Sequence, residues 1–464
     1  MPKSESSNTV KRAALLIAVV SNFLAPFTSM SVNLALPQIG KELGLDAVTL
    51  DWIITAYVLP TAMLLIPCGR AADIYGRKKI FVSGMFIYMI AALVLTFADS
   101  AAMIISFRFV QGIGGAMIFG TGIAIVTSVF PAAERGKALG IVFAAVSIGM
   151  FMGPPVGGFL THYFNWRSIF LVAVPLSLVA IYTAIWRLKG EWAEAKGEKV
   201  DYTGSLIYGV ALISIIYSFS LLPAISGAVL IIIGILGIGI FLWWEAKCKS
   251  PILNLRLFRE NRGFSCASLS AFINYSALAA TIFLMSLYLQ YIKGFSADFA
   301  GFIMILQPLI VIILSPVAGR LSDRIEPRFI VSAGMAICAI GLTLFVFLDQ
   351  DSALWSIILD LVILGVGFSL FTSPNMNAAM SAVETRDYGT ASGTMQTMRV
   401  LGQLMSMGVA MVIFSIFMGR ADITPEYYPQ LVQSYRTIFI IISVLCFAGI
   451  FVALAGGNVR KDKP

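Results

Sequence analysis

Three ionisable residues lie inside long apolar stretches of the sequence: Arg108, Asp360 and Arg399. A charge at the centre of a membrane helix costs about 2.5–3.5 kcal/mol on insertion scales, so each needs a partner, a water-filled cavity or a function. A buried carboxyl group takes up a proton more readily than one in water, so Asp360 is a candidate proton carrier. A structural ion pair, or a position near the interface beside Trp355, is the alternative. For Arg399, structural pairing and contact with an anionic substrate are equally open.

The rest of the chain indicates that these residues sit in membrane helices. Of its 464 residues, 59% are hydrophobic and only 12% are charged, and the mean hydropathy is +0.90. Soluble domains carry about 25% charged residues, so a soluble enzyme is excluded. A span needs about 20 mostly apolar residues. Such stretches predict an all-α integral membrane protein with fourteen spans, at residues 13–36, 51–69, 80–98, 102–126, 137–160, 168–187, 203–222, 224–244, 264–291, 298–318, 329–348, 353–378, 390–418 and 435–456.

The basic residues sort to one side of this predicted membrane. If the N-terminus is cytoplasmic, the outside loops hold only Lys41, Arg167, Lys293, Arg420 and Arg436. The inside loops and the C-terminal tail hold Arg70, Arg77, Lys78, Lys79, Arg135, Lys137, Arg187, Lys189, Lys196, Lys199, Lys247, Lys249, Arg256, Arg259, Arg262, Arg320, Arg324, Arg328, Arg386, Arg460, Lys461 and Lys463. This bias predicts a cell-membrane protein with both termini in the cytoplasm. The net charge of +8 is thereby explained without a nucleic-acid partner.

The residues that usually bind metals or nucleotides are scarce. The sequence has five cysteines without CxxC spacing, and its single histidine is His162. No GxxxxGK[ST] loop occurs, so nothing indicates ATP as an energy source. We therefore expect no metal, no cofactor and no enzymatic activity, and we expect a monomer.

The sequence contains an internal repeat. Residues 69–73 (GRAAD) are echoed by 319–323 (GRLSD) at an offset of 250, and residues 134–140 by 387–393 at an offset of 253. Repeated halves around a midplane site are the build of many secondary transporters. The repeat predicts an N-terminal six-helix bundle (1–189), a two-helix insert with basic flanks (190–262) and a C-terminal six-helix bundle (263–464).

The same offset places Asp360 within one position of the counterpart of Arg108. Both are therefore expected at similar depth, as candidate partners across the two halves. Such a pair would stabilise both charges in the membrane.

Three motifs, in order along the chain, carry a resemblance to a known family. Residues 69–79 read GRAADIYGRKK, residues 108–116 read RFVQGIGGA, and residues 149–158 read GMFMGPPVGG. With the two-helix insert, this set resembles the major facilitator superfamily, specifically its fourteen-helix drug:proton antiporter branch. The resemblance covers the whole chain and implies the major facilitator fold, with a role for Arg108 in proton coupling.

The first motif and its surroundings predict a cytoplasmic gate. Gly69 and Gly76 permit a tight turn, and Asp73 lies among Arg70, Arg77 and Lys78, with which it can form charge-assisted pairs. The resemblance implies that such pairs latch the outward-facing state. A basic loop with one solvated aspartate is the alternative. The gate residues that we expect are Gly69, Asp73, Gly76, Arg77, Arg135 and Asp323.

The third motif predicts a bare helix face. Gly149, Gly153 and Gly157 are spaced at i, i+4 and i+8, with Gly158 adjoining, so another helix can approach closely. Pro154, followed by a second proline, predicts a bend. The resemblance associates this bend with exchange rather than uptake; close packing alone is the alternative.

The substrate cavity is predicted from polar and aromatic residues within the spans. Thr28 stands where many members of the branch carry an aspartate, which weakens the case that the first span binds a cationic drug or a proton. The candidates are Thr28, Asn33, Tyr57, Asn375, Gln396 and Arg399, with Asn274, Tyr275, Gln307, Asn377 and Gln403 as further possibilities. Helix packing explains most of these positions equally well.

Together these features predict an exporter of lipophilic, drug-like small molecules in exchange for protons, working by alternating access in the lipid bilayer. The runner-up is an exporter or facilitator of a specific endogenous metabolite or peptide, without obligatory proton coupling. A membrane enzyme or a sensor is a third reading, but the sequence shows neither a cluster of catalytic residues at one membrane face nor an output domain.

Overall fold

The computed structural model describes residues 2–193, 195–198, 200–248, 252–384 and 387–457. Within these ranges, 14 helices are long and apolar enough to cross a membrane. The predicted all-α multi-pass fold is thus confirmed. The basic residues Lys199, Lys249, Arg386, Arg460, Lys461 and Lys463 used in the charge sorting lie outside the described residues.

Contacts divide the chain into two compact units. Unit 1 comprises Met1–Leu43, Trp52–Gly209 and Ser296–Gly301, and unit 2 comprises Gly44–Asp51, Val210–Phe295 and Phe302–Pro464. The helices of the first half are α1 (Pro2–Leu43), α2 (Ala47–Tyr75), α3 (Arg77–Leu95), α4 (Ala101–Val129), α5 (Ala132–Phe164) and α6 (Arg167–Trp186). Next follow α7 (Tyr202–Leu221), α8 (Ile225–Glu245) and the short α9 (Leu255–Glu260).

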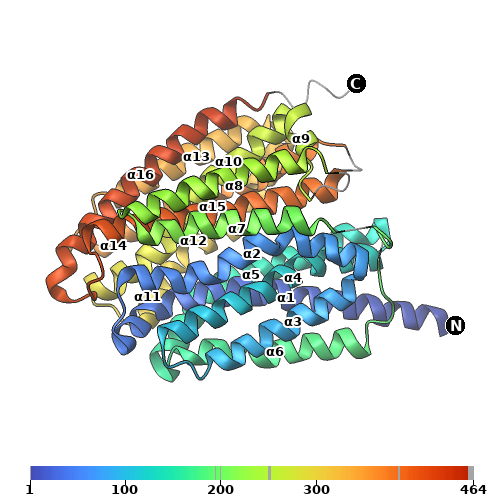
Figure 1. The fold of residues 1–464 in the computed structure, drawn as a ribbon, viewed down its shortest axis with the longest axis horizontal. Helices are drawn as coiled ribbons and strands as arrows, with labels where there is room; N and C mark the ends of the chain where they lie inside the picture. Colours follow the sequence, from blue (N-terminus) through green and yellow to red (C-terminus); the bar gives the residue numbers. More distant parts are fainter. Residues whose placement is uncertain (1, 194, 199, 249–251, 385–386, 458–464) are drawn as a thin grey trace. The chain divides into compact units, whose positions relative to one another are not determined.

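The second half repeats six spans. They are α10 (Arg262–Leu287), which continues as the π-helix η1 (Tyr288–Ile292), α11 (Ala297–Met304) with α12 (Leu306–Arg324), α13 (Pro327–Phe345), α14 (Leu354–Ser381), α15 (Tyr388–Phe417), and α16 (Tyr428–Leu454) after the short 3₁₀ helix η3 (Pro425–Tyr427). Figure 1 shows α13, α14 and α16 of unit 2 running alongside one another.

Glycines allow the helices of unit 1 to approach closely. A Cβ at Gly84 or Gly114, on the facing sides of α3 and α4, would lie 2.5 Å or 2.7 Å from atoms of the other helix. A Cβ at Gly112 of α4 would lie 2.3 Å from the carbonyl oxygen of Tyr57 in α2. No larger residue fits these positions without moving a backbone, so small residues set the interhelical distances, as is common in membranes.

Unit 2 repeats these contacts at the sequence offset of the motifs. Gly334 and Gly367 bring α13 against α14, each with its missing Cβ 2.7 Å from a backbone nitrogen of the other helix. Gly365 lies against the carbonyl of Gln307, as Gly112 lies against that of Tyr57. The internal repeat read from the sequence is therefore also a repeat of helix packing.

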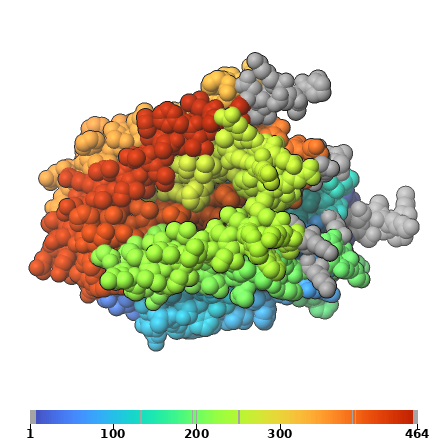
Figure 2. Space-filling view, turned by 45° about the horizontal axis from the view of Figure 1, so that its top comes forward, coloured from blue at the N-terminus to red at the C-terminus, as the bar shows by residue number. Residues whose placement is uncertain are grey.

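Among the described spans, α8 is the least buried, since only 17% of its most apolar 18-residue segment is buried. Ile225, Ile232, Ile235 and Leu236 are all exposed. Figure 2 shows α7 and α8 in green to yellow-green on the face turned to the viewer. Such a surface suits lipid rather than water.

Candidate functional site

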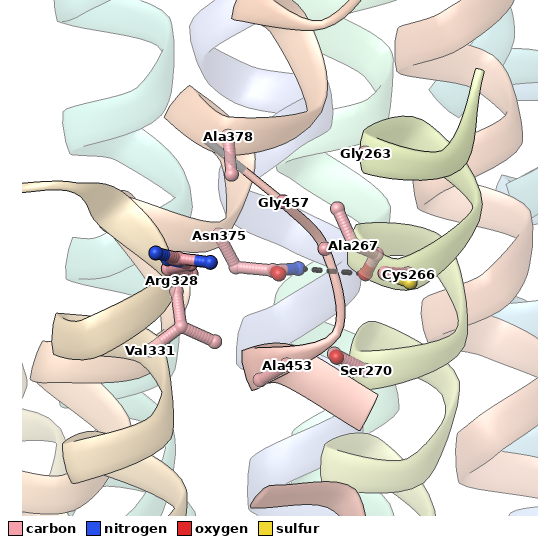
Figure 3. A pocket seen from close by; sticks show the side chains of 11 residues that line it. Gly263, Cys266, Ala267, Ser270, Arg328, Val331, Asn375, Ala378, Ala453 and Gly457 are labelled. Carbon is pink, nitrogen blue, oxygen red and sulfur yellow. Dashed lines mark hydrogen bonds between the residues drawn. The ribbon is translucent and has the colours of Figure 1, made fainter. Parts of the chain in front are cut away.

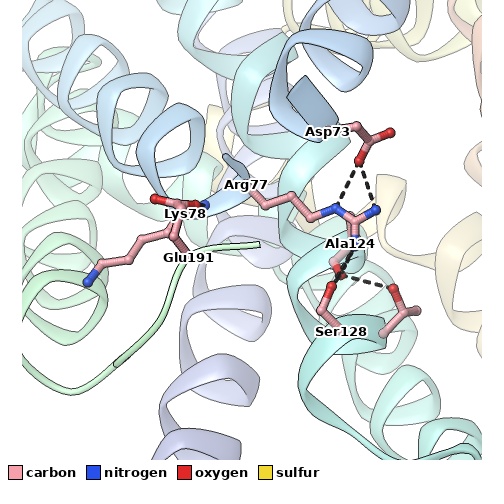
Figure 4. A network of polar contacts seen from close by, with 7 residues as sticks. Asp73, Arg77, Lys78, Ala124, Ser128 and Glu191 are labelled. Atoms are coloured by element: carbon pink, nitrogen blue, oxygen red, sulfur yellow. Dashed lines mark hydrogen bonds and ion pairs between the residues drawn. The ribbon is translucent and has the colours of Figure 1, made fainter. Parts of the chain in front are cut away.

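The first motif forms a polar network where α2 meets α3 (Figure 4). The Arg77 guanidinium donates to Asp73 from Nε at 2.9 Å and forms an ion pair through Nη2 at 2.8 Å. It also donates to the Ser128 hydroxyl and, at 3.4 Å, to the Ala124 carbonyl, both in α4. Arg77 therefore joins the α2–α3 turn to α4, and two of its nitrogens contact the same Asp73 oxygen, Oδ1, which the single ammonium nitrogen of lysine cannot reproduce.

A segment that follows α6 crosses this turn. The Glu191 carboxylate accepts from the backbone N–H of Lys78 at 2.8 Å, at the N-terminus of α3. The Arg77 N–H donates to the Trp192 carbonyl, and the Ala195 N–H to the Asp73 carbonyl, both at 2.9 Å. An acidic side chain is favourable at a helix N-terminus, where N–H groups lack partners. The contact between this segment and the α2–α3 turn was not predicted from the sequence, because no pattern around Glu191 indicates that its carboxylate binds the N-terminus of α3.

The other predicted gate residues are arranged differently. Gly69 has open space beside it. Arg70, which the sequence offers as a possible partner of Asp73, pairs with Glu198. Gly76 has φ +114°, a conformation that favours glycine. Arg135 is exposed and donates to the Phe130 carbonyl at 2.9 Å. Asp323 is exposed at the end of α12 in unit 2, so its role in a gate stays a prediction.

Arg108 lies at the centre of a buried cluster in unit 1. Its side chain is 0% exposed, donates to the Ile53 carbonyl at 3.1 Å and to Gln111 at 2.9 Å, and stacks over the Tyr57 ring at 4.5 Å. Within the described part of the chain, Nη2 of Arg108 and the Tyr57 hydroxyl have no hydrogen-bond partner. The pairing of Arg108 with Asp360 would join the two units and stays a prediction.

Two candidate cavity residues in α1 are buried and already bonded. The Thr28 hydroxyl accepts from Tyr88 of α3 at 3.0 Å. The Asn33 amide donates to the Ser29 carbonyl at 2.9 Å. Thr28 therefore joins α1 to α3, whereas the Asn33 bond stays within α1.

The glycines of the third motif divide between two neighbours of α5. Added Cβ atoms at Gly149, Gly153 and Gly157 would lie 2.5, 2.4 and 2.5 Å from atoms of α1. The Ser31 hydroxyl of α1 donates to the Gly153 carbonyl at 3.0 Å. Gly158 instead faces Ala297, whose carbonyl oxygen lies 2.3 Å from the added Cβ. We call the α1–α5 contact at Gly149, Gly153 and Gly157 the glycine seam. The α5 helix is continuous through Pro154, and a functional bend there stays a prediction.

A contact between a histidine and an aspartate lies next to Gly158. His162 of α5 and Asp298 of α11 approach to 2.9 Å, both within unit 1. His162 lies in the last turn of α5, two residues before the helix ends at Phe164. The contact between His162 and Asp298 could not be predicted from the sequence, because the two residues lie far apart in the chain and no motif links them.

Asp360 of α14 is buried inside unit 2, with 5% of its surface exposed. Among the residues that the structure describes, no hydrogen bond or ion pair is formed by its side chain. Trp355 on the same helix is 69% exposed. Because the two residues differ so much in exposure, the geometry favours a buried carboxyl over one that reaches the interface beside Trp355.

Asn375 lines a small cavity between α10, α13, α14 and the end of α16 (Figure 3). Its amide donates to the Ala267 carbonyl at 3.0 Å. The Ser270 hydroxyl and Nε of Arg328 line the same cavity and lack hydrogen-bond partners within the described chain. A cavity of about 20 Å³ holds a water molecule but not a drug-sized molecule.

Arg399 lies about midway along α15, with its guanidinium 5.0 Å from the centre of the Tyr275 ring of α10. Tyr275 in turn meets Phe368 of α14 edge to face at 5.6 Å. Gln396, one turn away on α15, is partly exposed. These residues bring a cation, two aromatic rings and an amide together inside unit 2.

No group of His, Cys, Asp and Glu residues suited to holding a metal ion is found in the described part of the chain. The charged side chains within the described spans include Arg108 in unit 1 and Asp360 and Arg399 in unit 2, and also the buried Asp51 and Glu245.

Comparison with known proteins agrees with this architecture. The chain is 28% identical to the riboflavin transporter RibZ of Clostridioides difficile, over 96% of this chain and 97% of the relative. It is 28% identical to the multidrug resistance protein Stp of Mycobacterium tuberculosis, over 87% of this chain and 75% of the relative. A crystal structure of the peptide transporter POT in complex with alafosfalin has the same fold, with a TM-score of 0.73, 16% identity and coverage of 99% and 100% of the two chains.

The sequence profile of the Major Facilitator Superfamily matches residues 18–243 and 267–464. These ranges include the three motifs and nearly all the spans. The chain is thus a multi-pass membrane transporter and not an enzyme, and it belongs to the Major Facilitator Superfamily.

Proposed function

We propose that this transporter exports small lipophilic molecules across the cell membrane in exchange for protons. Both termini would lie in the cytoplasm, and a monomer would alternate between inward- and outward-open states around a site between the halves 1–189 and 263–464. One observation supports export: the similarity to a multidrug resistance protein.

The proposal of proton exchange is based on Asp360. It is a buried carboxyl group in the second turn of the membrane helix α14, without a hydrogen bond or ion pair to the described residues. A carboxyl in such a place is more stable when protonated. Release of that proton requires water or a cation nearby, which a change of conformation supplies when it opens the site. Proton loading is thereby linked to the transport cycle.

The proposal of a cytoplasmic gate is based on the network of Asp73 and Arg77. Arg77 joins α2, α3 and α4 through charge-assisted bonds, and its side chain is only 9% exposed. Gly69, Gly76, Arg135 and Asp323 complete the proposed gate. Breaking the Asp73–Arg77 pair would change the balance between conformations rather than the substrate site.

The second candidate is a carrier of a specific metabolite without obligatory proton coupling. It is favoured by the similarity to a riboflavin transporter, which extends over nearly the full length of both chains. It predicts a narrow choice of substrate and movement that follows the substrate gradient alone.

Efflux from cells distinguishes the two candidates. Cells that express the protein are loaded with ethidium, riboflavin or naphthalene-2-carboxylate, and loss of each compound is followed with and without a protonophore. Export of chemically different compounds that stops on adding the protonophore supports the proposal. Movement of riboflavin alone, unchanged by the protonophore, supports the second candidate and contradicts the first.

A further inference from the structure

Arg399 is a membrane-embedded cation without an acidic partner in the described structure. Its one recorded interaction is with the Tyr275 ring, at 5.0 Å from the ring centre. No hydrogen bond or ion pair joins its guanidinium to any other described residue. Arg399 is only partly buried, so a group that enters from outside the helix packing can reach part of it.

The position of this cation in the membrane makes its lack of a partner significant. Arg399 lies about 17 Å from the start of α15, and Tyr275 and Phe368 lie about 20 Å from the inner ends of α10 and α14, at 1.5 Å per residue. All three are therefore near the middle of a hydrocarbon core of about 30 Å. A charge at this depth requires a counter-charge, water or a ligand.

The surroundings hold the guanidinium in place. Gly402, less than one turn away, lets α15 close on α10, because a Cβ there would lie 2.5 Å from the Phe272 carbonyl oxygen. The Arg399 guanidinium lies over the Tyr275 ring, and Phe368 meets Tyr275 edge to face. Because this guanidinium makes no hydrogen bond to the described residues, its N–H donors are available, and their fork matches a carboxylate or phosphate.

Two amides extend the same helix face. Gln396 and Gln403 precede and follow Arg399 by three and four residues, so all three lie within one narrow arc of α15. Both are partly exposed, and neither has a hydrogen bond within the described chain. Next to the cation they offer donors and acceptors to the polar groups of a ligand.

We propose that Arg399, Tyr275 and the two glutamines form a binding site for organic anions that carry an aromatic or other planar group. The anion pairs with the guanidinium edge, the planar group lies against the Tyr275–Phe368 cluster, and the glutamines bind its remaining polar atoms. This inference rests on the proposed transport function and adds the charge of the preferred substrate.

Binding to the purified protein in detergent tests the site without any gradient. The probes are naphthalene-2-carboxylate, 2-naphthylmethanol and 2-naphthylmethylammonium, which share one ring system and differ in charge. Calorimetric titration is expected to show the carboxylate binding most tightly. Arg399→Gln should reduce that preference about tenfold or more, as expected for a charge-assisted hydrogen bond. Arg436→Gln, at an exposed position in α16, should leave it unchanged.

A second variant covers the case in which Arg399→Gln does not fold. Tyr275→Leu keeps the charge but removes its platform, and should weaken binding of the carboxylate more than that of the alcohol. Tighter binding of the alcohol or the ammonium to the unmodified protein, or a preference for the carboxylate that survives Arg399→Gln, would overturn the proposal.

This binding result is independent of the efflux result. If the carboxylate binds as expected but efflux ignores the protonophore, the anion site stands and proton exchange fails. If efflux depends on protons but the charge preference is absent, the proposed function stands and the anion site fails.

Discussion

Replacement of Gly153 by alanine tests whether the glycine seam sets the distance between α1 and α5. The added Cβ would lie 2.4 Å from the Cβ of Met30 and 3.2 Å from the Phe27 carbonyl oxygen. Carbon atoms pack at about 3.5–4.0 Å, so the two helices would have to separate by about 1 Å or more. A Cβ cannot rotate away as the end of a long side chain can.

The expected loss follows from two opposing terms. Forcing extra atoms into a packed contact costs about 1–3 kcal/mol. Alanine is about 1 kcal/mol better than glycine within a helix, which offsets part of that cost. The net effect of Gly153→Ala is therefore a loss of up to about 2 kcal/mol.

The control is Gly140→Ala in the same helix. Gly140 has no atom within 4 Å of its added Cβ, so only the helix-forming gain of alanine remains. Thermal unfolding of the two purified variants should show a lower midpoint for Gly153→Ala, and an unchanged or higher one for Gly140→Ala. Equal midpoints would refute the role given to the seam. For transport, the larger Gly153→Leu should insert into the membrane but move no substrate; full activity would remove the seam from the mechanism.

Two further stability predictions concern unit 1. Gly76→Ala should lower the midpoint of thermal unfolding, because φ +114° is strained for alanine and the added Cβ would lie 2.5 Å from the Glu191 carboxyl. The control is Gly69→Ala, where nothing lies within 4 Å of the added Cβ. Equal midpoints for the two variants would contradict the strain argument. Tyr88→Phe should lower the free energy of unfolding by about 0.5–1.5 kcal/mol, because it removes the hydrogen bond to Thr28. If chemical denaturation gives the same free energy of unfolding as for the unmodified protein, the bond does not contribute to stability.

The fold was largely predictable because each span is a long run of apolar residues. The predicted stretch 224–244 matches α8 (Ile225–Glu245), and 390–418 matches α15 (Tyr388–Phe417). The ends of other helices were less predictable. The apolar run 13–36 continues as helix from Pro2 to Leu43, since polar residues at both ends extend the helix beyond the apolar segment. The stretch 298–318 is divided at Ile305 into α11 and α12, which hydropathy does not reveal.

The site was predictable only where a residue is unusual for its surroundings. Asp360 and Arg399 stand out as charges in apolar runs, and the structure shows both partly or fully buried. The contacts of loops were not predictable: Glu191 reaches Lys78 and Glu198 reaches Arg70 across more than 100 residues. Such pairs depend on how the chain folds back, and no periodic pattern in the sequence encodes them.

The most direct test of proton exchange is a measurement of the pH gradient in energised inside-out vesicles that contain the protein. Adding a transported compound should collapse part of the gradient, because each exchange cycle lets protons out. Asp360→Asn should abolish that response, whereas Asp349→Asn, at an exposed turn between α13 and α14, should preserve it. A response of full size in Asp360→Asn vesicles would contradict the role of this carboxyl, and its absence in the unmodified protein for every compound that the cells export would contradict proton exchange itself.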